Sequence, residues 1–304
     1  MQNRDFSEAL DAAITGNRLN RTVSKKLQRL LNKIFLEGPL RPLKNFANGS
    51  WLEHPLHPLL TDVPVGAWTV TILLYLAALL FGMNELGIAI ALAMGLGILA
   101  ALAAIATGFM DWMDVDPTEL SIGFTHAVVN SFGTLLFIVA WALLFTAQWQ
   151  VSVANFIPAL VGYGVIAGGA YLGGTLVFRF GTMINRNAYR SGPKEFTPVV
   201  AFEDLADNKP TRFVVQGQPV LLVRHGQRVY AIGAVCSHYG APLEQGTIHG
   251  STIECPWHYS RFSLEDGSVK TGPATAPVPL YETDVKDDKI WIRVLRVAQT
   301  VSPH

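Results

Sequence analysis

The sequence Cys236-Ser-His238 is followed, after sixteen residues, by Cys255-Pro-Trp-His258, and these two boxes hold both cysteines of the chain. Each cysteine stands two or three positions before a histidine. Two thiolates and two imidazoles can hold a [2Fe–2S] cluster in which the cysteines ligate one iron and the histidines the other. The same four side chains are also a zinc ligand set, so the spacing alone leaves the metal open.

The residues around the boxes form a longer motif. The first box continues as Cys236-Ser-His-Tyr-Gly-Ala-Pro-Leu243, the second as Cys255-Pro-Trp-His-Tyr-Ser-Arg-Phe262, and Gly272-Pro273 follows. This motif resembles the Rieske iron–sulfur family of the ferredoxin type, over roughly residues 197–296. The resemblance favours iron over zinc. It implies that Cys236 and Cys255 hold the inner iron, that His238 and His258 hold the outer iron, and that Gly272 and Pro273 belong to a third loop covering the cluster.

Two positions beside the second box differ from the family pattern. In high-potential members, a serine two residues and a tyrosine four residues past the last histidine donate hydrogen bonds to the cluster. Ser260 matches the serine, but Phe262 replaces the tyrosine and has no hydroxyl. The resemblance therefore predicts a potential in the middle or lower part of the family range of roughly −150 to +300 mV. Tyr259 stands where the family usually has glycine, and a positive φ there would strain it.

The composition indicates a membrane domain joined to a soluble one. Half of the residues are hydrophobic. Only 15% are charged, whereas charged residues make up about a quarter of a usual soluble protein. Charged residues are nearly absent from residues 63–149, outside short loops, and return after Phe178. The formal net charge is zero, so no overall positive field favours nucleic acid as a partner.

Four apolar runs are long enough to cross a bilayer, which needs about 20 residues. They span residues 63–82, 86–110, 122–149 and 153–178. We therefore predict an α-helical bundle of four transmembrane helices followed by an all-β Rieske iron–sulfur domain. The expected organisation is a basic helical segment (1–50), the transmembrane domain (51–180), a linker (181–196), the Rieske domain (197–296) and a tail (297–304).

The membrane half contains histidines near the ends of the expected helices. His54 and His57 each precede a proline, and over residues 50–185 the chain resembles a bacterial four-helix family with a His-Pro motif before its first helix. That resemblance brings no established activity. Ionisable residues at membrane depth are often functional, so His54, His57 and His126 are candidate haem or metal ligands, with His57 and His126 as an axial pair. The alternative is that they bond to carboxylates or backbone carbonyls. The glycines of the fourth run, such as Gly169 and Gly173, indicate close helix packing.

Lysine and arginine flank the bundle on one side. They precede the first apolar run and follow the fourth, while the two short opposite turns contain none. The positive-inside rule then predicts a multi-pass protein of the bacterial inner membrane with both termini and the Rieske domain in the cytoplasm. The polar N-terminus predicts no cleavable signal peptide.

These features predict a membrane-anchored Rieske electron-transfer protein, with the lipid bilayer and an unidentified electron donor and acceptor as partners. One alternative is the electron-transfer subunit of a haem- or quinone-linked membrane oxidoreductase. Another is a redox or iron sensor coupled to the bundle. No catalytic residue is identified, so enzymatic activity stays open.

Overall fold

The computed structural model describes residues 6–296, so the expected tail and the polar N-terminal residues 1–5 lie outside the described part. The chain divides into two compact units. The helical unit comprises the chain up to Leu43 together with Leu56–Thr182, and the β unit comprises Lys44–Pro55 together with the chain from Met183 onward.

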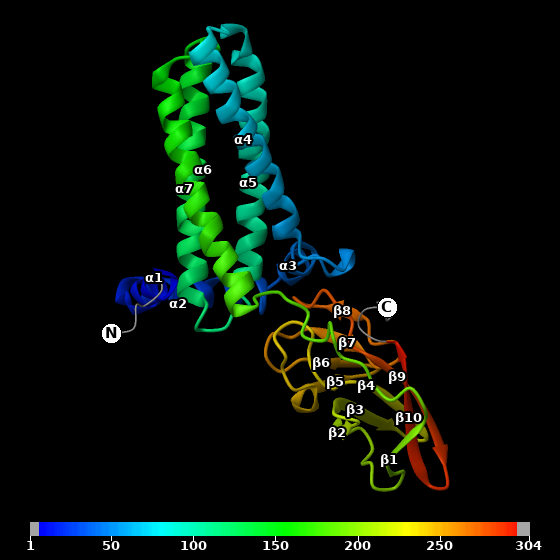
Figure 1. Cartoon of the computed structure of the whole chain (residues 1–304). Coiled ribbons are helices and arrows are strands. Elements are labelled where there is room, and N and C mark those ends of the chain that lie inside the picture. Colours follow the sequence, from blue (N-terminus) through cyan, green and yellow to red (C-terminus); the bar gives the residue numbers. More distant parts are fainter. Residues whose placement is uncertain (1–5, 297–304) are drawn as a thin grey trace. The chain divides into compact units, whose positions relative to one another are not determined.

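Four long helices form the helical unit (Figure 1). They are α4 (Leu56–Phe81), α5 (Gly87–Trp112), α6 (Leu120–Thr146) and α7 (Val153–Gly174), which continues as a π-helical turn over Thr175–Phe180. All four are long and apolar enough to cross a membrane, as predicted. The pattern is a pair of helical hairpins, α4–α5 and α6–α7, and both hairpins begin at the same end of the bundle (Figure 1).

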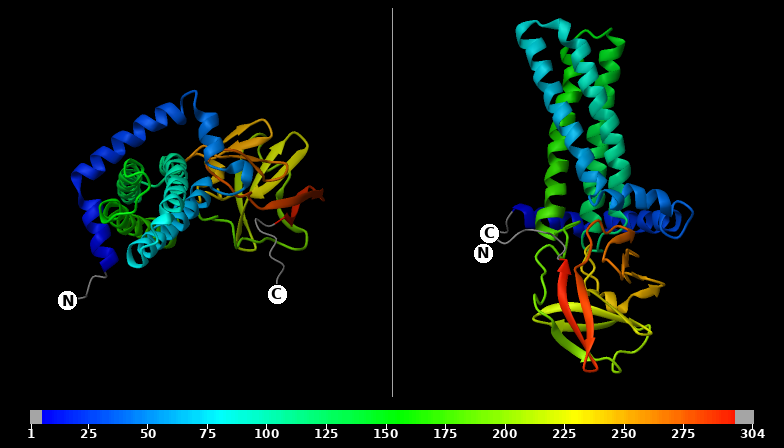
Figure 2. Two further views of the ribbon diagram at one scale, coloured as in Figure 1. Left: turned by 90° about the horizontal axis from the view of Figure 1, so that it is seen from above. Right: turned by 90° about the vertical axis from the view of Figure 1, so that its right-hand side faces the viewer.

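Two shorter helices, α1 (Phe6–Gly16) and α2 (Arg18–Phe35), run around the outside of that end of the bundle (Figure 2). Asn20 donates from Nδ2 to Thr125 Oγ1 at 2.7 Å, and Gln28 donates from Nε2 to the Met113 carbonyl at 3.1 Å. Polar side chains therefore attach α2 to the rest of the helical unit.

Helix α4 begins at Leu56, seven residues before the start expected from the apolar run. Pro58 lies in the first turn, where a helix amide has no intrahelical partner, so it does not prevent this earlier start. Pro64 lies inside the helix. The earlier start places His57 in the first turn of α4.

The β unit is built from two antiparallel sheets. The larger has the order β1-β10-β9-β4-β3-β2 and the smaller the order β5-β6-β7-β8. The strands of the larger sheet are β1 (Thr197–Ala201), β2 (Thr211–Val215), β3 (Gln218–His225), β4 (Arg228–Gly233), β9 (Leu280–Lys286) and β10 (Lys289–Arg296). Those of the smaller sheet are β5 (Thr247–His249), β6 (Thr252–Glu254), β7 (Arg261–Ser263) and β8 (Val269–Thr271). The predicted all-β domain is confirmed.

One apolar core of the β unit includes both cysteines. Leu221 and Ile232 of the larger sheet pack in it with Ile253 and Phe262 of the smaller sheet, and all four are fully buried. The shared core keeps water away from the two sulfur atoms. The Lys44–Pro55 segment, which contains the end of α3 (Arg41–Ala47) and a short turn at Ser50–Leu52, belongs to the same unit.

Candidate metal centre

Two loops of the β unit carry the four predicted ligands. We name Cys236–Ala241, after β4, the first loop and Cys255–Ser260, between β6 and β7, the second loop. In each, the cysteine N–H donates to the carbonyl five residues on, at 2.9 Å in the first loop and 2.7 Å in the second. The amide four residues on donates back to the cysteine carbonyl, at 3.0 and 3.2 Å. Both boxes therefore fold into the same tight turn.

The two thiols lie close together in the core. Each cysteine is 1% exposed, and neither is in a disulfide. A hydrogen bond between the thiols, followed by backbone N–H groups of His258 and Trp257, lowers the pKa of Cys255 to about 7 against the opposing effect of burial. The same thiol pair and burial raise the pKa of Cys236. Two thiols that compete for a proton fit a site where both are thiolates on one iron.

The two histidine rings lie beside each other, with centroids 5.1 Å apart and planes at 85°. His238 is 4% exposed, yet neither of its ring nitrogens has a hydrogen-bond partner among the described residues. A buried polar group without a partner costs free energy, and ligation of a metal ion would remove that cost. Burial holds the pKa of His238 well below its ordinary value, and the positive charges of His258, Lys44 and Arg186 lower it further. The neutral imidazole is the form that ligates metals.

The four side chains pair by type. The two thiols share a hydrogen bond, and the two imidazole rings lie beside each other. A Rieske [2Fe–2S] cluster takes two cysteines on one iron and two histidines on the other, and this pairing fits it.

A third loop, after β8, packs on the second. Gly272 has φ +98°, and a Cβ there would lie 2.5 Å from Ser260 Cα, so only glycine fits. Ser260 is fully buried and its Oγ accepts a hydrogen bond from Ala274 N–H at 3.0 Å, which leaves its hydroxyl proton to donate elsewhere. Pro273 is buried in this loop, and Phe262 is fully buried in the core without a polar atom on its side chain.

Residues far from the motif also support the loops. Arg186 N–H donates to the Ser237 carbonyl at 3.0 Å, and Asn187 Nδ2 donates to the Val235 carbonyl at 2.8 Å. Asn45 Oδ1 accepts from Gly272 N–H at 3.2 Å. Sequence reasoning missed these contacts because no local pattern connects them with the motif.

Lys44 is the least expected residue near the centre. It is 1% exposed, and its Nζ donates to Asn48 Oδ1 at 3.0 Å. A buried ammonium is rare and carries a high desolvation cost. Its positive charge acts on His238, so the chain places a buried cation close to the predicted outer iron.

Two families match the chain. Residues 195–282 match the Rieske [2Fe-2S] domain, and residues 53–186 match a family described as a predicted membrane protein, DUF2231. The ferredoxin CarAc of Metapseudomonas resinovorans is 33% identical over 78 residues, which are 26% of this chain and 73% of that protein. The chain belongs to the Rieske [2Fe–2S] family. Its Rieske domain is fused to a DUF2231 membrane domain, as the two resemblances predicted, and the Rieske match implies a [2Fe–2S] cluster.

Further relatives match the same third of the chain. The ferredoxin subunit of anthranilate 1,2-dioxygenase from Burkholderia cepacia is 28% identical over 100 residues, covering 33% of this chain and 93% of that protein. The solved ferredoxin of carbazole 1,9a-dioxygenase from Nocardioides aromaticivorans IC177 is 36% identical and covers 32% of this chain and 96% of its own, with a TM-score of 0.32. These likenesses concern the Rieske domain and leave the DUF2231 domain to be interpreted from its own residues.

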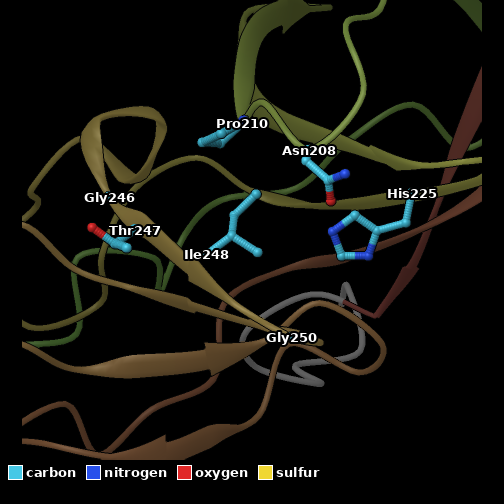
Figure 3. A pocket seen from close by; sticks show the side chains of 7 residues that line it. All are labelled: Asn208, Pro210, His225, Gly246, Thr247, Ile248 and Gly250. Atoms are coloured by element: carbon cyan, nitrogen blue, oxygen red, sulfur yellow. The ribbon is translucent and has the colours of Figure 1, made fainter.

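A wide pocket on the surface of the Rieske domain contains none of the ligands (Figure 3). Its lining includes Asn208, His225 and Ile248. The ring of His225 packs against Tyr230 with centroids 5.5 Å apart. His225 is half-buried, and its Nε2 has no hydrogen-bond partner among the described residues.

Of the three histidines proposed for the membrane half, His54 lies apart from His57 and His126. His54 belongs to the β unit, is exposed, and its Nδ1 lies 2.8 Å from the Pro55 carbonyl. His57 and His126 both belong to the helical unit, and their ring centroids lie 6.1 Å apart. The structure thus brings together only the pair.

Proposed function

We propose that this chain is a membrane-anchored one-electron carrier whose [2Fe–2S] cluster is held by Cys236 and Cys255 on one iron and by His238 and His258 on the other. The observation that carries the proposal is the pairing of two thiols with a buried imidazole that has no other partner, on two loops with the same turn. When bound, a [2Fe–2S] cluster accepts and releases one electron at a time.

Residues around the cluster site affect its reduction potential. Burial of both cysteines excludes water from the sulfur side. Positive charge from Lys44 and Arg186 near His238 favours the added electron. Phe262 contributes no hydrogen bond, which lowers the potential relative to members with tyrosine there. We expect a potential in the middle or lower part of the Rieske range.

We also propose that the Rieske domain faces the cytoplasm of a bacterial inner membrane. The lysines and arginines before α4 and after α7 support this orientation, because basic residues near transmembrane ends stay in the cytoplasm. The names of the ferredoxin relatives support a redox protein as the electron donor or acceptor. Protease treatment of inside-out vesicles should cleave the Rieske domain, and cleavage only in right-side-out vesicles would refute this orientation.

The cluster assignment is tested with the full chain purified in detergent. We expect two irons and two acid-labile sulfides per chain and, after dithionite, the low-temperature EPR signal of a reduced Rieske cluster. His258→Ala should lose the signal, whereas His225→Ala, which changes a histidine of the same domain outside the loops, should keep it. Stoichiometric zinc without an EPR signal would overturn the assignment.

A further inference from the structure

Two histidine rings meet inside the DUF2231 bundle. His57 lies in the first turn of α4 and His126 in the second turn of α6. Their ring centroids are 6.1 Å apart and their planes stand at 89°. Neither belongs to the Rieske domain, and the proposed electron carrier does not use them. A pair of imidazoles in a membrane bundle is a candidate cofactor site.

The hydrogen bonds define the tautomer of both rings. Nδ1 of His57 lies 2.8 Å from the Ala104 carbonyl of α5, and Nδ1 of His126 lies 2.8 Å from the Gly169 carbonyl of α7. A carbonyl only accepts, so each Nδ1 carries the proton and donates it. The Asn130 amide is 3.1 Å from Nδ1 of His126, but it donates to the His126 carbonyl at 2.8 Å.

Each neutral ring therefore has its lone pair on Nε2. Histidines that ligate metals show the same arrangement, with the other ring N–H donated to a carbonyl or carboxylate that fixes the orientation of the ring. Backbone carbonyls of two neighbouring helices thus hold both rings ready to ligate through Nε2.

Glycines make room for the two rings. A Cβ added to Gly108 would lie 2.8 Å from Cε1 and Nδ1 of His57, and a Cβ added to Gly173 would lie 2.9 Å from Cε1 of His126. Both distances are shorter than real Cβ contacts. Gly173 was expected to allow close packing of two helix backbones. Its nearest neighbour is instead the ring of His126.

The two hairpins repeat one another. His57 and His126 are 69 positions apart, and so are Trp68 and Phe137, whose rings stack with centroids 4.1 Å apart. The second helices of the hairpins keep a constant shift of 65 positions, which relates Gly97 to Gly162, Ala104 to Gly169 and Gly108 to Gly173. In each hairpin, the first helix supplies the ring, and the second supplies the carbonyl and, four residues later, the glycine. Such parallel repeats in membrane proteins place ligand sites between the repeats.

We propose that the DUF2231 bundle binds one haem b, with His57 and His126 as its two axial ligands through Nε2. A metal–nitrogen bond of about 2.0–2.1 Å on each side, with the metal between the rings, puts the ring centroids roughly 6 Å apart. Among the described residues, no third His, Cys, Asp or Glu joins the pair as a ligand. A bare ion would lack ligands there, whereas a haem brings four of its own. Both cysteines lie in the Rieske domain, so the haem is bound without thioether bonds.

The haem iron would take one electron from a one-electron donor, such as a reduced iron–sulfur protein, and return it to a one-electron acceptor. Only residues of the helical unit form this site, so it is independent of the cluster. It would make the chain an electron carrier with two kinds of cofactor.

The test uses the full chain in detergent, produced with a haem precursor or incubated with hemin and then freed of excess. We expect one haem per chain by the pyridine haemochromogen assay and, after dithionite, the sharp α and β bands of low-spin bis-histidine haem b. His57→Ala and His126→Ala should each lower bound haem at least ten-fold. His54→Ala, which removes an exposed histidine, should leave it unchanged.

Folding is checked on the same preparations by size-exclusion elution and helical circular dichroism. His57→Met and His126→Met introduce a thioether of similar size, which can also ligate haem iron. These variants should bind haem with an altered α band, so loss of haem is separable from loss of the bundle. The wild-type chain without a haem band after incubation with hemin would overturn the proposal. Full haem content in the His57→Ala/His126→Ala variant would overturn it as well.

Discussion

The first and second loops of the Rieske domain make the same turn from different residues. Four positions after each cysteine, the backbone has a positive φ, which is +81° at Gly240 and +61° at Tyr259. Glycine adopts this conformation freely, whereas for other residues the left-handed region costs roughly 1–2 kcal/mol. The first loop therefore has glycine, the residue that this backbone conformation favours. The second loop adopts the same turn although Tyr259 is strained there.

The loops also differ in their surroundings. His238 of the first loop is 4% exposed, and Lys44 and Arg186 lie near it. In the second loop, Trp257 is 50% and Tyr259 43% exposed. The comparison indicates that the first loop is the buried and positively charged side of the centre, and that the second loop is its strained and exposed side.

The largest expected effect removes a ligand from either loop. Cys236→Ser and Cys255→Ser should each abolish the cluster, because both thiolates hold the same iron and neither loop replaces the other. Iron content and the EPR signal after reduction measure the loss. A cluster that survives with full occupancy in only one of the two variants would show that the loops are not equivalent in ligation.

Lys44→Met tests the charge difference between the loops. Removal of a buried positive charge disfavours the added electron, so the midpoint potential should fall by some tens of mV, where about 60 mV corresponds to a tenfold change for one electron. An EPR-monitored redox titration measures the shift. The exposed Lys289 of β10 provides the control, and Lys289→Met should leave the potential unchanged. An equal potential in the Lys44 variant would contradict an electrostatic effect of this residue.

Gly240→Ala gives the first loop the strain of the second. A Cβ at Gly240 meets its nearest atoms at 3.8 and 3.9 Å, so the backbone conformation is the only obstacle. We expect about 1 kcal/mol of destabilisation. For a domain of this size, that lowers the temperature at which half of the cluster absorbance is lost by about 4–8 °C. An unchanged temperature would mean that the turn relaxes without cost.

The smallest effect is the reverse change in the second loop. Tyr259→Gly relieves the positive φ but increases the entropy of the unfolded chain, so the net stabilisation should be about 0.5 kcal/mol. The same temperature measurement should rise by a few degrees, while the potential stays within error. A lower temperature would show that the exposed tyrosine ring contributes packing that outweighs the strain.

Sequence alone predicted the local features of the molecule. The four predicted ligands lie within short boxes, and the apolar runs define the four helices by composition. The possible strain at Tyr259 is confirmed by its φ of +61°. In each case, the physical cause lies within a few residues of the pattern.

The missed features depend on residues far apart in the chain. Lys44 and Asn45 precede the whole membrane domain, yet they belong to the β unit with the ligand loops. His57 was expected before the first helix because the apolar run begins at residue 63, but the helix begins at Leu56, and proline is tolerated in a first turn. The shifts of 69 and 65 positions between the hairpins are visible in the residue numbers. Only the structure shows that these shifts relate two histidine rings and the two carbonyls that hold them.

The repeat divides the histidine pair equally between the two hairpins. Each hairpin supplies half of a symmetric pair of rings, so one hairpin alone holds a single imidazole. A two-helix peptide spanning Leu56–Trp112 carries the ring, the carbonyl and the glycine of such a half. Because both halves lie in one chain, each can change in sequence separately, as Trp68 and Phe137 or Ala104 and Gly169 differ at related positions.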